Sequence, residues 1–88
     1  MKVQKTGAVV EVDIHGLRAE DAEYRLRHLI DNAGSDVTEI VVIHGYNRGQ
    51  TLRDMVWNTL SHPRIQTRLK SLNEGKSRIL LKKPPRKR

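Results

Sequence analysis

Residues 8–16 read AVVEVDIHG. The side chains alternate between two sets, which is the pattern of a strand with one apolar face. One set is Val10, Val12 and Ile14, and the other is Val9, Glu11, Asp13 and His15. Asp13 and His15 therefore share a face near the carboxyl end of the strand, which Gly16 ends. We expect the apolar face to be buried under helices and the opposite face to be partly polar.

The elements that follow along the chain are a helix, a second strand and a second helix. The first helix is predicted between Gly16 and Gly34 from apolar residues at helical spacing: Ala22, Leu26, Leu29, Ile30 and Ala33. Residues 40–43 are an unbroken β-branched run, typical of a strand buried on both faces. Thr51 is expected to cap the second helix, which Pro63 ends. The inward positions of this helix are Leu52, Met55, Val56 and Leu60.

The remaining segments are less regular. Residues 1–7 are expected to be unstructured or an edge segment, and residues 77–82 a last strand. Ile65, Leu69 and Leu72 have helical spacing, but the turn signal of residues 73–75 follows them, so the structure of residues 64–76 stays open. We expect one domain over residues 1–82, with an ordered core from about residue 8, and a disordered basic tail over residues 83–88.

The order β-α-β-α-β predicts an α/β fold built of packed layers. Its sheet is expected to be mixed or parallel with helices on one face, and its first two strands adjacent and parallel. The direction of the last strand stays open. The predicted core is Val10, Val12, Ile14, Leu26, Leu29, Ile30, Ile40, Val42, Leu52, Val56 and Leu60.

Composition narrows the classes of function. The chain of 88 residues has no cysteine, which excludes disulfides and thiolate metal sites. Neither a membrane-spanning run nor a secretory leader is recognised, so we expect a cytoplasmic protein without a membrane partner. The net charge is +7, and residues 63–88 hold ten Lys/Arg against one Glu. This asymmetry favours a polyanion such as nucleic acid as partner, with a merely solvated tail as the alternative.

Two histidines, His15 and His44, each end a predicted strand and each precede a glycine. Ligands of open α/β sheets bind outside the carboxyl ends of strands, so we expect both imidazoles to point into one crevice. Ordinary turn chemistry is the competing interpretation. The coincidence of two His-Gly pairs, with Asp13 beside one of them, favours a phosphate site.

Several neighbours of the histidines fit the same interpretation. Gly16, Gly45 and Gly49 let the backbone approach a phosphate, Asn47 tolerates left-handed geometry, and Arg48 adds a charge-assisted contact. A structural role is favoured for His28 and His62. For Trp57, a place at the edge of the core is favoured over a base-stacking role.

These residues also carry a resemblance to a family. Residues 12–16, VDIHG, resemble the LDLHG element of the Smr (small MutS-related) domain, and residues 44–49, HGYNRG, are similar to its second element, HGxGxG or HGxG. Residues 73–81 are similar to its late turn and final strand. The resemblance spans residues 11–82 and implies a two-layer α/β sandwich like the C-terminal domain of translation initiation factor three. It also implies association with nucleic acid, with DNA nicking or RNA cleavage by several members.

The resemblance assigns the family's functional positions to Asp13, His15 and His44, and to Gly45 and Gly49. Asn47 departs from the family, which usually has glycine there. Lys76, which precedes the last predicted strand, and Arg78, which lies on it, are expected to add contacts to phosphate.

The leading hypothesis is an endonuclease that acts on RNA or, as second choice, DNA. His15, oriented by Asp13, and His44 would form its acid-base pair, because a histidine pKa of about 6.5 permits both protonation states. No cofactor is certain and no metal ligands are assigned. A route in which Asp13 and histidine hold Mg²⁺ or Mn²⁺ stays open as a variant. The alternatives are a non-catalytic nucleic-acid-binding module and a protein-interaction module.

Overall fold

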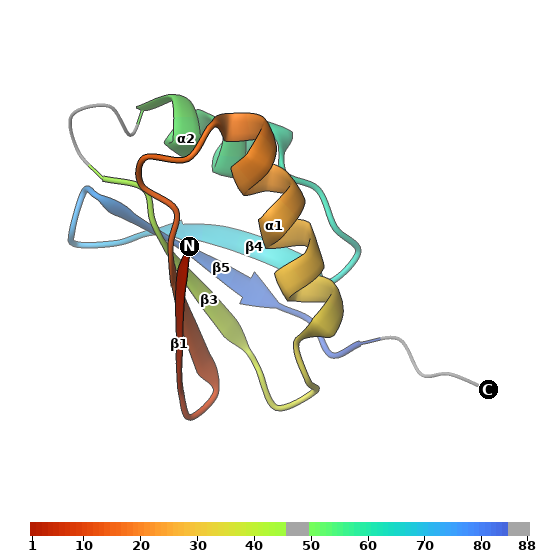
Figure 1. Ribbon diagram of the computed structural model, residues 1–88. Coiled ribbons are helices and arrows are strands. Elements are labelled where there is room, and N and C mark those ends of the chain that lie inside the picture. The colour runs from red at the N-terminus through yellow and green to blue at the C-terminus, as the bar shows by residue number, and fades with distance from the viewer. Residues whose placement is uncertain (46–49, 85–88) are drawn as a thin grey trace.

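The computed structural model describes residues 1–45 and 50–84 (Figure 1). Within these residues, five strands form one sheet in the order β1-β2-β3-β5-β4. The strands are β1 (Lys2–Thr6), β2 (Val9–Asp13), β3 (Glu39–Ile43), β4 (Ile65–Lys70) and β5 (Lys76–Leu81). The neighbours β2 and β3 are parallel, and the other three pairs are antiparallel. The expectation of two adjacent parallel strands in a mixed sheet is therefore confirmed.

The helical layer consists of α1 (Ala19–Asn32), α2 (Gln50–Asp54) and the π-helical turn η1 (Met55–Thr59), which continues from α2. Figure 1 shows these helices on the same face of the sheet. The predicted α/β sandwich with helices on one face is thus confirmed. Thr51 lies inside α2, which begins at Gln50, so the prediction that Thr51 precedes the helix as its cap is wrong. None of the described helices is long and apolar enough to cross a bilayer.

The core lies between the helical layer and one face of the sheet. Strands β2, β3 and β5 alternate strictly between buried and half-buried residues, because the helices cover one face only. Of the predicted core residues, only Leu29 is not fully buried, and it packs against the cluster. Val41 and Ile43 are half-buried, so the prediction that residues 40–43 are buried on both faces is wrong for these two. The buried apolar residues are Val10, Val12, Ile14, Ala22, Leu26, Ile30, Val37, Ile40, Val42, Leu52, Met55, Val56, Leu60, Ile79 and Leu81.

Two strands, one near each end of the chain, are added to the predicted order of elements. Residues 2–6 form an edge strand, β1, which pairs with β2 through a turn at Gly7, where φ is +62°. The segment with helical spacing, residues 64–76, forms β4 and the turn into β5 instead of a helix. The order is therefore β-β-α-β-α-β-β. Of the predicted tail, residues 85–88 lie outside the described residues.

Candidate nucleic-acid site

The carboxyl ends of β2 and β3 bring the two His-Gly segments together. Asp13 is paired with Ile43 in the parallel register, and the Ile14 amide donates to the Ile43 carbonyl at 3.0 Å. A Cβ built on Gly45 would lie 3.7 Å from the Cβ of His15. The expected meeting of the two segments at one edge of the sheet is therefore present in the backbone.

Asp13 fixes the imidazole of His15. The Nδ1 atom of His15 lies 2.5 Å from Oδ1 of Asp13, and the His15 amide donates to the same oxygen at 3.0 Å. Partial burial acts to raise the pKa of the Asp13 carboxyl, but the hydrogen bonds from His15 lower it overall. The carboxylate is then ionised at neutral pH and accepts the Nδ1 proton. The His15 side chain is 69% exposed, so Nε2 is the ring nitrogen available to a ligand.

His44 lies in the opposite environment, at 2% exposure. Its Nδ1 is 3.1 Å from the Gly45 carbonyl oxygen, and its Nε2 is 3.0 Å from Oγ of Ser77. Because a carbonyl can only accept, Nδ1 carries the proton and Nε2 accepts from the Ser77 hydroxyl. Burial lowers the pKa of His44, and the charge of Arg53 lowers it further. His44 is therefore a neutral residue with both ring nitrogens engaged.

The prediction that Asp13, His15 and His44 line one open crevice is consequently wrong. Ile40, Val42 and His44 alternate onto the face that the helices cover, whereas Asp13 shares the uncovered face with Ile43. The alternation rule that grouped Asp13 with His15 would also have placed His44 under the helices.

The glycines of the two segments serve the backbone in different ways. Gly16 and Gly45 have φ values of +84° and +90°, which a residue with a Cβ rarely adopts. The amides of His44 and Gly45 both donate to the Gly75 carbonyl, at 2.9 and 3.0 Å. The Gly45 N–H is therefore not free to bind a phosphate. A phosphate could still approach closely, because Gly45 has no side chain to block it. The other predicted loop residues, Asn47, Arg48 and Gly49, lie outside the described residues.

A family model supplies the assignment. The model of the Smr domain matches residues 12–78 of the 88-residue chain. The chain belongs to the Smr domain family. Smr domains generally bind nucleic acid, and some members are nicking endonucleases. No curated protein matches this Smr domain.

The two predicted basic contacts on β5 are ion-paired on the uncovered face of this Smr domain. Nζ of Lys76 lies 3.3 Å from Oε2 of Glu11, and Arg78 contacts both carboxylate oxygens of Glu39 at 2.7 and 3.1 Å. The Arg78 guanidinium lowers the pKa of the Glu39 carboxyl. A phosphate at either cation would compete with a carboxylate already in place.

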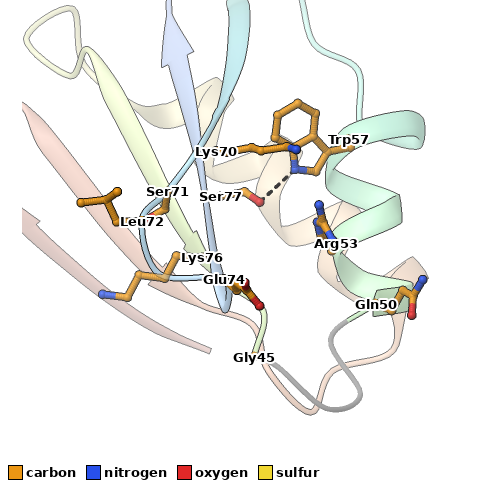
Figure 2. A pocket seen from close by; sticks show the side chains of 10 residues that line it. All are labelled: Gly45, Gln50, Arg53, Trp57, Lys70, Ser71, Leu72, Glu74, Lys76 and Ser77. Carbon is orange, nitrogen blue, oxygen red and sulfur yellow. Dashed lines mark hydrogen bonds between the residues drawn. The ribbon is translucent and has the colours of Figure 1, made fainter.

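A pocket of about 570 Å³ opens on the helix side of the sheet, beside Gly45 (Figure 2). Trp57 lies at its wall and donates Nε1–H to Oγ of Ser77 at 2.9 Å. As predicted, Trp57 packs at the edge of the core. No pattern in the sequence indicates this pocket, because its lining comes from three separate segments of the chain. The lining residues are Gly45, Gln50, Arg53, Trp57, Lys70, Ser71, Leu72, Glu74, Lys76 and Ser77.

Within residues 1–45 and 50–84, no group of three or more His, Cys, Asp or Glu side chains is placed to hold a metal ion. Of the residues predicted as possible metal ligands, Asp13 and His15 lie next to each other.

Proposed function

We propose that this Smr domain binds nucleic acid and cleaves RNA with His15 as general base. One observation carries the proposal: Nδ1 of an exposed imidazole is fixed on the Asp13 carboxylate, which leaves Nε2 facing solvent. This is the arrangement that an imidazole needs in order to accept a proton from a bound hydroxyl. Asp13 sets the tautomer and the orientation of the ring.

The reaction uses the nucleophile that RNA itself provides. Nε2 of His15 takes the proton of a 2′-hydroxyl, and the 2′-oxygen attacks the adjacent phosphorus. The bond from phosphorus to the 5′-oxygen breaks, and the leaving oxygen takes a proton from water. The products are a 2′,3′-cyclic phosphate and a 5′-hydroxyl. DNA has no 2′-hydroxyl and is not cut by this route.

His44 takes part as a positioning residue. It holds the Gly45 carbonyl through Nδ1 and Ser77 through Nε2. Since Gly45 lies against His15, this network fixes the backbone beside the proposed base. Substrate is attracted by the basic residues 63–88, whose ten Lys/Arg against one Glu outweigh the net negative charge of the rest of the chain.

A non-catalytic nucleic-acid-binding module is the second candidate. The observation that favours it is the burial of His44, which removes this imidazole from the acid-base pair that the sequence predicted. Among the described residues, His15 then has no second exposed histidine beside it to protonate the leaving oxygen, although a binding surface remains.

Substitution at His15 separates the two candidates. We expect His15→Ala to lower the rate of RNA cleavage about 10²- to 10⁴-fold, because it removes the general base. Asp13→Asn should also lower the rate, since it removes the carboxylate that fixes the tautomer. Cleavage of end-labelled RNA with and without EDTA measures the rate, and the fluorescence anisotropy of labelled RNA measures binding. Both variants should keep wild-type affinity.

His28→Ala is the matched control, because His28 is an exposed histidine on α1. It should cleave at the wild-type rate. RNA that is bound but left intact, whatever divalent ion is added, would make the binding module the better description. Cleavage that requires added Mg²⁺ or Mn²⁺ and leaves a 3′-hydroxyl would contradict the proposed mechanism.

A further inference from the structure

The pocket at Trp57 has the lining of a site for a single nucleotide. Its volume of about 570 Å³ lies in the range of small-molecule sites. Figure 2 shows Trp57, Lys70 and Arg53 grouped around Ser77, with Gln50 and Glu74 nearer Gly45, whereas Leu72 and Lys76 point away from Trp57. An aromatic ring beside cations is the combination by which proteins bind single-stranded nucleic acid.

The indole of Trp57 is held in place before any ligand arrives. Its Nε1–H donates to Ser77, a residue at 2% exposure, and Ser77 in turn donates to His44. The π-helical turn that carries Trp57 is also clamped to β4, because the Arg68 guanidinium donates to the carbonyls of Val56 and Leu60. A ring fixed in this way loses little conformational entropy when a base stacks on it.

The polar groups of the pocket match the rest of a nucleotide. Among the described residues, neither Arg53 nor Lys70 forms an ion pair, so both cations are available to a phosphate. Glu74 adds a carboxylate, which accepts from amino or imino groups on the edge of a base. A bare phosphate would gain nothing from the indole and would be repelled by Glu74.

We infer that this pocket, named the Trp57 pocket after its wall, binds one unpaired nucleotide of a single strand. The inference rests on the proposed nucleic-acid binding and names its substrate class. Gly45 lines the Trp57 pocket, and a Cβ built on it would lie 3.7 Å from the Cβ of His15. A strand that passes Gly45 thus places one base on Trp57 while its backbone reaches His15. A base held in a duplex cannot enter, which makes single strands the preferred substrate.

Trp57 can serve as an intrinsic fluorescent probe of this pocket, because it is the single tryptophan of the chain. A 2′-O-methyl RNA of about ten nucleotides, which the proposed reaction cannot cut, should quench the fluorescence of Trp57 on binding. The same sequence as a duplex should leave the fluorescence unchanged. Trp57→Leu should weaken binding of the single strand on the order of tenfold by anisotropy, and Trp57→Phe should retain most of the affinity.

Lys70→Gln and Lys82→Gln form a matched pair, because each removes one positive charge and Lys82 is exposed outside the pocket. Lys70→Gln should weaken binding of the single strand more than Lys82→Gln. This comparison and the wild-type fluorescence decide the matter even if Trp57→Leu does not fold, which circular dichroism would reveal.

Two results would overturn the inference, and they have different meanings. If the single strand binds without changing Trp57 fluorescence, and the two lysine variants bind equally, then the Trp57 pocket is not the site, while nucleic-acid binding stands. If neither oligonucleotide binds at all, the proposed function fails together with the inference.

Discussion

The imidazoles of His15 and His44 follow adjacent parallel strands but have opposite environments. His15 is exposed and rests on the Asp13 carboxylate, so one ring nitrogen remains open to a ligand. His44 is buried and uses both ring nitrogens within the protein. Proton transfer to a substrate is therefore assigned to His15, and support of the backbone to His44.

The burial of His44 has a consequence for stability against pH. Its pKa in the folded protein is lowered, whereas an unfolded histidine has a pKa of about 6.5. Below that pH the unfolded state binds more protons, so the free energy of unfolding falls as the pH falls. Above about pH 6.5 the contribution of His44 is fully present. Urea denaturation between about pH 7.5 and 5.5 should show a decline of at most about 1.4 kcal/mol per pH unit from this group.

The variant His44→Gln isolates this effect. It should unfold more easily at every pH, but its free energy of unfolding should change less with pH than that of the wild type. His28→Gln, at an exposed site, should keep the wild-type slope. The carboxyl groups with lowered pKa, such as Glu39, lose their contribution only at lower pH, outside this range. Equal slopes in wild type and His44→Gln would contradict the neutral, buried assignment.

For single residues, the sequence predicted the position of a side chain correctly where the alternation within one strand was sufficient to assign its face. The alternation in residues 8–16 correctly grouped Asp13 with His15. It gave no account of His44, because the β-branched run before it was interpreted as buried on both faces. The Trp57 pocket needs the packing of α2, η1 and the β4–β5 turn, which no local pattern contains.

At the scale of elements, Arg64 joins the end of α1 to the end of the sheet. It is 3% exposed, and its guanidinium donates to the carbonyls of Ala33, Gly34, Val37 and Lys82 at 2.7 to 3.3 Å. Carbonyls that follow a helix have no partner inside the helix, and a cation there is also favoured by the helix dipole. Arg64 thus supplies hydrogen-bond donors to the backbone carbonyls in the turn from α1 toward β3.

Replacement of Arg64 should therefore destabilise the fold without touching the proposed site. Arg64→Lys keeps the charge but cannot reach all four carbonyls, so buried acceptors lose their donors. We expect the free energy of unfolding, measured in urea, to fall by about 2 to 4 kcal/mol. Arg25→Lys, at an exposed position of α1, should change it little. A wild-type midpoint for Arg64→Lys would show that these hydrogen bonds contribute nothing net.

The ambiguous pattern of residues 64–76, whose structure could not be predicted from the sequence, has a physical cause among the strands. The pairing of β4 with β5 shifts register between Ile65 and Thr67. Such a bulge adds one residue to a strand, so half-buried positions recur after three residues, at Ile65 and Arg68, as they would in a helix. Leu69 and Leu72, which completed the apparent helical period, are exposed. Regular strands and α1 follow simple periods and were predicted correctly.

In the whole molecule, fewer of the positive charges in residues 63–88 are free to bind a polyanion than their number in the sequence indicates. Four of its cations are engaged within the fold: Arg64 and Arg68 with carbonyls, and Lys76 and Arg78 with carboxylates. Lys70 lines the Trp57 pocket, and Lys82 and Lys83 are exposed. The remaining cations, Arg86, Lys87 and Arg88, lie beyond the described residues. Long-range attraction of nucleic acid is therefore expected to depend mainly on the end of the chain.

Removal of residues 83–88 tests this dependence, because it deletes four positive charges while retaining the Lys82 carbonyl that Arg64 binds. Each phosphate contact releases counterions, so the logarithm of affinity falls with that of salt by about 0.7 to 0.9 per contact. The truncated protein should bind RNA more weakly at low salt and show a flatter slope in anisotropy titrations. Glutamine at the same four positions, which keeps the length, should reproduce the change. If both variants keep the wild-type affinity and slope, the end of the chain does not contact nucleic acid, and the attraction must come from cations on the folded surface.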